Sequence, residues 1–216
     1  LRITIIERNT TPLGASTRNA GFACFGSPTE LIHQAATMGT DAMLQLVELR
    51  HRGIEKIKAN FKAAEIAFCP SGGYECINRN YPGWNQLNDK IDWLNTLLKP
   101  ITGREQSFQR KDEKLSQQGL VGFDALIENT SEASLHSGML VQSLTRKVQS
   151  AGVTILYGVE LQRWEKHQSL ITVETKQGIP ISAQQILFCT NAFTRNFLPG
   201  LKIKPARGQV IVTTPI

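Results

Sequence analysis

The sequence lacks the patterns that define several large classes of protein. Its four cysteines, Cys24, Cys69, Cys76 and Cys189, form no C-x-x-C pair and have no histidine at metal-ligand spacing. A disulfide framework and a metal site are therefore not expected, and the cysteines are predicted to be buried thiols of a reducing compartment. There is no signal peptide and no apolar run long enough to span a bilayer. These absences predict a cytoplasmic protein without a transmembrane segment.

Two further absences concern the chemistry. No Ser/His/Asp, Cys/His or paired-carboxylate arrangement stands out, so the sequence offers no candidate for a catalytic nucleophile or general base. Lysine and arginine form no dense block, although the formal net charge is +6 and the pI is near 9.3. A moderately basic surface suits an anionic cofactor or substrate, and gives no clear sign of a nucleic-acid partner.

The opening stretch of the chain carries the first positive signal in the sequence. Ile3–Ile6 is apolar and β-branched, which is typical of a buried parallel strand, and Glu7 closes it. An acid at the carboxyl end of such a strand lies where doubly wound sheets bind nucleotides, and it can accept hydrogen bonds from ribose hydroxyls. The alternative is an ordinary strand that ends in a solvated acid.

The segment after this strand favours the first interpretation. A loop ending at Gly14 leads into 15–22, a run of small and hydrogen-bonding residues that lets backbone N–H groups approach a large flat or anionic ligand. Together these features predict half of a dinucleotide site. The glycine-rich turn G-x-G-x-x-G, which lies about 20 residues before the acid in such sites, is missing. Because the chain begins at Leu1 inside an apolar run, we expect a fragment that starts at its second strand.

The rest of the 216-residue chain, with 41% hydrophobic residues, is long enough for one large or two small domains. Helical spacing is predicted over 28–61, 84–98 and 138–150. A hairpin of 66–69 with 74–77, an exposed connection over 104–118 and extended chain over 122–135 are expected between them. Residues 153–157 are a predicted parallel strand, followed by an antiparallel meander over 159–181 and a buried strand over 186–189.

In this order, the pattern resembles the D-amino-acid oxidase/glycine oxidase type of FAD-dependent oxidoreductase. The resemblance extends over nearly the whole chain, without the family's opening strand and its C-terminal portion. It rests on five stretches, of which the second is the most specific: Ile5-Ile6-Glu7-Arg8, 14–21, 152–161, 187–192 and 205–210. The resemblance implies an α/β fold, in which a Rossmann-like FAD-binding domain with a parallel sheet and a β-meander carries an inserted α+β substrate domain. The FAD-binding domain is expected at 1–65 and 136–200, and a partial substrate domain at 66–135 and 201–216.

The resemblance also implies roles for individual residues. Glu7 would accept hydrogen bonds from the adenosine ribose, and Arg8 would lie along adenine, neutralise phosphate or remain solvated. The main chain at Leu161 would contact adenine, unless the residue is only part of the core. Further candidates line the pyrophosphate and flavin or lie in the crevice at a strand's carboxyl end, with tight or polar turns as the alternative: Ser16, Arg18, Asn19, Ala20, Gly21, Thr190 and Asn191. Tyr74 and Arg207 are weak candidates for substrate binding.

The activity that the resemblance implies is oxidation of a C–N bond next to a carboxylate, with hydride transfer to flavin. The partners would be a small-molecule amine or amino acid and an electron acceptor, either oxygen or a quinone. Because the flavin performs the redox step, no dedicated general base is required if the amine arrives neutral. Two alternatives remain open. The same fold is also used in tRNA base modification, and a binding module without flavin would keep the sheet alone.

Overall fold

The computed structural model describes residues 1–206 and 208–211, which divide into two compact units. Unit 1 consists of Leu1–Asn19 and of the described residues from Leu144 onward, and unit 2 of Ala20–Ser143. Helix α6 (Ser137–Ser150) therefore begins in unit 2 and ends in unit 1. No helix of the described residues is both long and apolar enough to cross a membrane.

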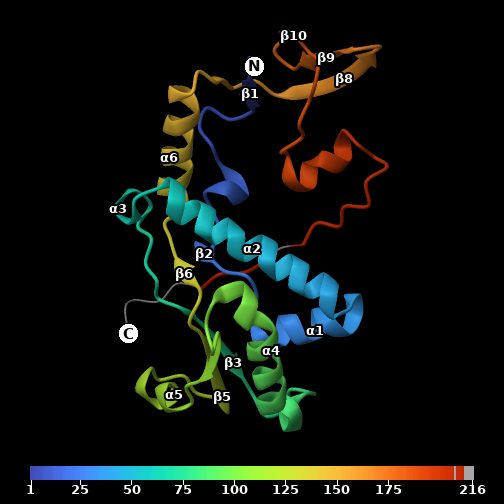
Figure 1. Cartoon of the computed structure of the whole chain (residues 1–216). Coiled ribbons are helices and arrows are strands. Elements are labelled where there is room, and N and C mark those ends of the chain that lie inside the picture. Colours follow the sequence, from blue (N-terminus) through green and yellow to red (C-terminus); the bar gives the residue numbers. More distant parts are fainter. Residues whose placement is uncertain (207, 212–216) are drawn as a thin grey trace. The chain divides into compact units, whose positions relative to one another are not determined.

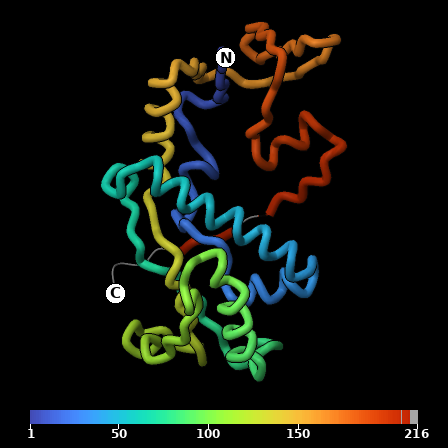
Figure 2. The backbone as a smooth tube through the Cα atoms, in the orientation of Figure 1, coloured from blue at the N-terminus to red at the C-terminus, as the bar shows by residue number. Residues whose placement is uncertain are grey.

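Unit 1 contains a parallel strand pair and an antiparallel meander. Strand β1 (Thr4–Glu7) pairs in parallel with β7 (Thr154–Tyr157), so that Glu7 lies opposite Tyr157. The meander has the order β10-β9-β8. Its strands are β8 (Leu161–His167), β9 (Leu170–Thr175) and β10 (Pro180–Ala183). Unit 1 also holds two short 3-10 helices, η1 (Gly14–Ser16) and η3 (Asn191–Asn196). Figure 2 follows the chain through η3 into 197–206, which form no helix or strand.

Unit 2 is built on three packed helices, α1 (Pro28–Met38), α2 (Thr40–Asn60) and α4 (Leu87–Thr102). Pro28 occupies the first turn of α1, where its missing N–H costs nothing, and Gly39 separates α1 from α2 with a φ of +91°. Figure 1 shows the course of the three helices, and their buried apolar side chains belong to one core. Three short elements complete the helical part: α3 (Ala63–Ile66), α5 (Glu113–Gln117) and the 3-10 helix η2 (Trp84–Gln86).

Two antiparallel sheets complete unit 2. The first has the order β3-β5-β4, with β3 (Gly73–Ile77), β5 (Ala125–Asn129) and β4 (Phe108–Arg110). The second pairs β2 (Phe22–Ala23) with β6 (Ala133–Ser134). One face of the first sheet adds Ile77, Ile127 and Phe108 to the helical core, and all three side chains are at most 5% exposed.

Most of the predicted elements are confirmed. The opening strand, the helices near 28–61, 84–98 and 138–150, the parallel strand near 153–157 and the meander all form, with ends shifted by a few residues. Extended chain over 122–135 also forms, as β5 and β6. These segments carry clear hydrophobic periodicity, which is the most reliable local signal of helix or strand.

The predicted hairpin of 66–69 with 74–77 is wrong. Residues Ala63–Ile66 form α3, which ends where Ala67 takes a left-handed conformation with a φ of +48°. Cys69 then bridges to Ser134, whereas β3 pairs with β5. The two segments do not pair with each other, because each pairs with a distant part of the chain.

The predicted exposed connection over 104–118 is also wrong, because it contains β4 and α5. Phe108 is 1% exposed, and its backbone N–H and carbonyl are both bonded to the Asn95 side chain of α4 at 2.9 Å. This side-chain clamp fixes a polar segment that has almost no apolar pattern of its own.

Three predictions of burial fail. The opening strand forms as predicted, but it is not buried, since Ile3 and Ile5 are 46% and 41% exposed. Residues 186–189 form no strand, and Leu187 is 86% exposed, because no strand of the described residues pairs with this segment. The cysteines are free thiols, but Cys24, Cys69 and Cys189 are exposed and only Cys76 is half-buried. The assignment of FAD-binding and substrate-binding roles to particular domains stays a prediction; 20–65 belong to unit 2 in the structure.

Candidate functional site

The carboxyl end of β1 is the centre of the candidate site in unit 1. The Glu7 carboxylate is half-buried, and its Oε1 accepts hydrogen bonds from the backbone N–H of Asn9 at 2.9 Å and from Asn9 Nδ2 at 2.8 Å. These bonds hold the carboxylate at the end of the strand. A carboxylate has about four acceptor positions, so the two bonds from Asn9 leave capacity for hydroxyl donors.

Main-chain hydrogen bonds join this strand end to the start of the meander. Gly158 N–H donates to the Asn9 carbonyl at 3.0 Å, and Val159 N–H donates to the Glu7 carbonyl at 3.0 Å. Leu161, two residues further on, begins β8 opposite Thr175, next to an irregularity in the pairing of β8 and β9. The structure therefore brings the segment that leads into Leu161 to the end of β1.

A third segment reaches the same strand end through a cation–π contact. The Arg8 guanidinium carbon lies 4.6 Å from the ring centre of Phe193, which belongs to η3. The helix begins after Thr190, whose hydroxyl is 2.9 Å from that of Thr194, and Asn191 has a φ of +48°. Sequence reasoning missed Phe193, although an aromatic residue three positions after Thr190 was visible.

The small-residue loop after β1 forms a tight turn. Gly14 has a φ of +79°, and its carbonyl accepts the N–H groups of Thr17 and Arg18 at 3.2 and 2.9 Å. Asn19 Nδ2 donates back to the carbonyls of Ala15 at 2.8 Å and Ser16 at 3.3 Å. Ser16, Arg18 and Asn19 are exposed, so this turn presents its polar groups to solvent.

The last two residues of the loop, Ala20 and Gly21, belong to unit 2. Ala20 is exposed, whereas Gly21 is buried with a φ of +71°. The Gly21 carbonyl accepts the N–H of Leu135 at 2.8 Å. A Cβ at Gly21 would overlap the Leu135 carbonyl oxygen, so both the conformation and the close approach require glycine here.

Charged side chains hold the segment that follows Gly21, and sequence reasoning missed them. Glu132 Oε1 accepts the backbone N–H groups of Phe25 at 3.0 Å and Gly26 at 3.3 Å. Arg50 donates to the Phe25 carbonyl and to Glu30, at 3.0 Å in each case. Burial raises the pKa of Glu132; the two N–H donors lower it in part, and the nearby Glu30 raises it. Glu132 lies in a polar turn without any motif, so only the fold identifies it.

A second carboxylate, Glu75 of β3, holds the start of α1. It accepts hydrogen bonds from the Ser27 hydroxyl at 3.0 Å, from the Thr29 backbone N–H at 3.1 Å and from the Thr29 hydroxyl. The N-terminus of α1 is thus capped by a carboxylate of strand β3, because the side chain of the N-cap residue Ser27 makes no capping hydrogen bond.

The two weak substrate candidates have different outcomes. The Tyr74 hydroxyl donates to Glu128 Oε1 at 2.7 Å and also contacts the Lys114 ammonium, so it is part of an ion-paired network on the β3–β5 sheet. The hydrogen bond from Tyr74 lowers the pKa of Glu128, and Lys114 lowers it further. Arg207 lies outside the described residues.

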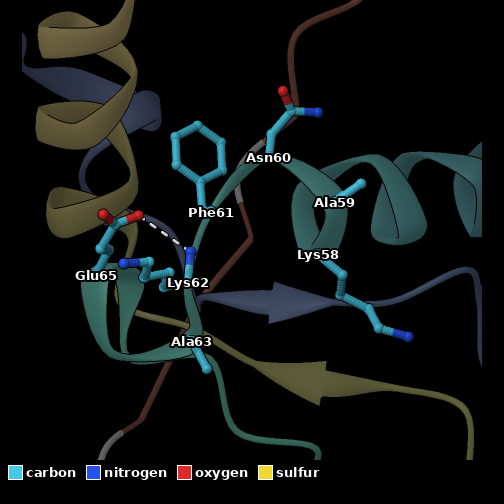
Figure 3. A pocket seen from close by; sticks show the side chains of 7 residues that line it. All are labelled: Lys58, Ala59, Asn60, Phe61, Lys62, Ala63 and Glu65. Carbon is cyan, nitrogen blue, oxygen red and sulfur yellow. Dashed lines mark hydrogen bonds between the residues drawn. The ribbon is translucent and has the colours of Figure 1, made fainter.

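A hollow in unit 2 lies away from these residues along the chain, where α2 ends and α3 begins. Its volume is about 630 Å³. Its lining residues are Lys58, Ala59, Asn60, Phe61, Lys62, Ala63 and Glu65 (Figure 3). The Lys62 N–H donates to Glu65 Oε2 at 3.0 Å, as in a capping box. None of the predicted site residues lines this hollow.

Comparison with known proteins identifies the family. The family model of FAD-dependent oxidoreductases matches residues 1–216. A comparison with curated protein sequences finds no match.

Among solved structures, the chain resembles glycine oxidase from Geobacillus kaustophilus, with 17% identity and a TM-score of 0.59, over 90% of this chain and 50% of that one. It also resembles L-proline dehydrogenase from P. horikoshii, with 15% identity and a TM-score of 0.65, over 94% of this chain and 50% of that one. Iminodiacetate oxidase from Chelativorans sp. BNC1 shows 17% identity and a TM-score of 0.59, over 94% and 53% of the two chains.

The chain thus spans about half the length of these proteins. The fold likeness confirms the predicted α/β class, with its parallel strands, meander and additional antiparallel sheets. Since the family model covers the whole chain, the protein belongs to the DAO family of FAD-dependent oxidoreductases.

Proposed function

We propose that the chain holds FAD in an enzyme that oxidises the C–N bond of an amino acid or a related amine. One observation supports the cofactor site above all others. The carboxyl end of β1 joins Glu7, the segment of Leu161 and the η3 helix through the Glu7–Val159 hydrogen bond and the Arg8–Phe193 contact. These three segments are more than 150 residues apart in the sequence at their extremes, yet they meet where parallel sheets bind nucleotides.

The residues at this strand end fit the adenosine half of FAD. Glu7 supplies an ionisable acceptor that Asn9 holds in place, and the Arg8 guanidinium lies over an aromatic ring, as it could over adenine. The proposal assigns the remaining predicted residues to the pyrophosphate and the flavin. They are Ser16, Arg18, Asn19, Ala20, Gly21, Thr190 and Asn191.

Bound FAD would supply the hydride acceptor for oxidation of the C–N bond. The protein's task is then to bind the substrate, orient the carbon of that bond and tune the surroundings of the ring. The amino-acid substrate class is supported by the names of similar structures, which refer to glycine, L-proline and iminodiacetate. The electron acceptor would be oxygen or a quinone. Tyr74 and Arg207 remain weak candidates for holding the substrate carboxylate.

The first test is the colour of the full-length protein that carries this chain. A purified flavoprotein is yellow, and FAD released on denaturation is identified by its mass. A colourless protein that fails to bind added FAD would contradict the proposal and favour a binding module without flavin.

The second test compares two acids of unit 1. Glu7→Ala removes the proposed ribose acceptor and should raise the Kd for FAD by about 10- to 150-fold, because hydrogen bonds to charged groups contribute about 1.5–3 kcal/mol. Glu165→Ala is the control, since Glu165 of β8 is exposed and its Oε2 lies 3.2 Å from His167 Nε2. Titration of the apoprotein with FAD, followed by fluorescence, measures both. An equal loss in the two variants would remove Glu7 from the site.

A turnover panel then separates the substrates. We expect reduction of the flavin by one or more of glycine, D-amino acids, L-amino acids and N-methyl amino acids. Absence of turnover with the whole panel, together with tight binding of tRNA, would favour the tRNA base-modification alternative.

A further inference from the structure

The segment from Gly21 to Gly26 is fixed at both ends by groups from the other strand of its sheet. At one end, Leu135 N–H donates to the Gly21 carbonyl, and Phe22 and Ala23 pair with Ser134 and Ala133. At the other end, the Glu132 side chain accepts two backbone N–H groups. Residues 132–135, which include β6, therefore hold both ends of this segment. Their backbone pairs with its start, and the Glu132 carboxylate binds its end.

We propose that Glu132 is a positioning residue for the flavin-contacting segment Ala20–Gly21. This inference rests on the proposed function, because it takes Ala20 and Gly21 as part of the FAD site. Glu132 acts through the chain of β2, which it holds against β6.

The surroundings of Glu132 leave this carboxylate little freedom. A Cβ at Gly73 would overlap Glu132 Oε2, so the backbone at the start of β3 lies close against the side chain. The Phe25 ring, which is fully buried, lies 6.1 Å from Phe108 and 6.2 Å from His51 between ring centres. The backbone of Phe25 is thus tied by Glu132 on its N–H and by Arg50 on its carbonyl.

The charged and titratable groups around Glu132 come from two helices and from the segment itself. Arg50 reaches the segment from α2, Glu30 adds a like charge from α1, and the Cys24 thiol lies on the segment itself. An amide would satisfy the same two N–H donors without a charge to bury. The role that we infer needs only a hydrogen-bond acceptor at residue 132. A glutamine there should therefore keep the role, and an alanine should lose it.

The test uses the full-length protein and three variants. Glu132→Ala removes the acceptor, Glu132→Gln keeps one, and Asn95→Ala removes a comparable buried clamp on Phe108 as the control for lost stability. The Kd for FAD is measured by fluorescence titration. Amide hydrogen exchange of the apoprotein is measured at Phe25, Gly26 and Leu135.

We expect Glu132→Ala to raise the Kd for FAD by about tenfold, a change that corresponds to about 1.4 kcal/mol. The same variant should speed exchange at Phe25 and Gly26 and also at Leu135, whose N–H is bonded to Gly21. Glu132→Gln should restore both measurements to within about twofold of the wild type, because it keeps an oxygen acceptor. If Glu132→Ala does not fold, Glu132→Asp, which shortens the reach, should show the same changes to a smaller degree.

The inference is overturned if Glu132→Ala binds FAD as tightly as the wild type, or if Asn95→Ala weakens FAD binding to the same extent. It is also overturned if Glu132→Gln is as impaired as Glu132→Ala. The proposed function fails separately, when the wild-type protein binds no FAD. In that case the amide hydrogen exchange of Leu135 still shows whether Glu132 holds the segment from Gly21 to Gly26.

Discussion

Units 1 and 2 differ in how they bury apolar side chains and in the charge that they carry. The hydrophobic core cluster lies entirely in unit 2, where Phe25, Leu31, Met43 and Leu94 are fully buried. In unit 1, Ile5 of β1 and the preceding Ile3 are 41% and 46% exposed. The buried aliphatic residues there, among those described, are Val159, Ile171 and Val173.

The charges are divided just as unequally. Unit 1 carries twelve lysine and arginine residues but four acids, whereas unit 2 carries twelve and fourteen in residues 20–143. The net charge of +6 therefore arises from unit 1 alone, which also contains the proposed adenosine and pyrophosphate residues. The comparison indicates that unit 2 has the core of a stable domain, while unit 1 has the charge of an anion-binding one.

The largest expected effect tests the difference in cores. Leu94→Ala should lower the free energy of unfolding of the 216-residue chain by about 2–5 kcal/mol, because Leu94 is fully buried in unit 2. Leu187→Ala, the matched change in unit 1, should alter it by less than about 0.5 kcal/mol, since Leu187 is 86% exposed. Urea unfolding measures both, and comparable losses would contradict the contrast.

The next effect concerns one glycine from each unit. Gly21→Ala should cost about 3 kcal/mol or more, because it adds a steric overlap with Leu135 to the strain of a positive φ. Gly14→Ala has open space around the added Cβ and should cost about 1 kcal/mol from its φ of +79° alone. Circular dichroism during thermal unfolding compares them. A similar loss for both would mean that the approach to Leu135 can relax.

A pH effect of intermediate size belongs to unit 2. The folded-state pKa of Glu132 is raised, so its contribution to stability is complete below the unfolded-state pKa and is lost as the pH rises through the folded-state value. Between acidic and neutral pH, the free energy of unfolding of Glu132→Gln should therefore decrease less than that of the wild type. Urea unfolding across that range checks the prediction, and identical pH profiles would contradict it.

The smallest effect is expected for a surface ion pair of unit 1. Arg163 forms two hydrogen bonds with Glu174, at 2.7 and 2.6 Å, and these lower the pKa of Glu174. Because both groups are solvated, Arg163→Ala should leave the midpoint of thermal unfolding unchanged within error. A clear, salt-dependent decrease would show that charge contributes more to unit 1 than its exposure suggests.

Several parts of the fold follow from local pattern. Alternation and β-branched residues identified β1, β7 and the meander, and helical spacing identified α1, α2, α4 and α6. The part of the site that lies on these elements was therefore visible: Glu7 closes a strand, and Leu161 begins another.

The failures share one cause. Strand partners and side-chain clamps come from distant parts of the chain, as when Asn95 fixes Phe108 or Ser134 pairs with Cys69. Residues 186–189 are the opposite case. They have the apolar pattern of a strand but form none, since no distant strand of the described residues pairs with them. Neither effect leaves a trace in a local window.

The sequence by itself determined the family, the acid at the end of the first strand and the small-residue loop behind it, because these depend on residue types at short spacing. Only the tertiary structure decided that Phe193 lies on Arg8, that Glu132 holds Phe25 and that Gly21 has no room for a side chain. Such contacts join residues up to 185 positions apart, as Arg8 and Phe193 are, and they exist only once packing has brought their strands and helices together.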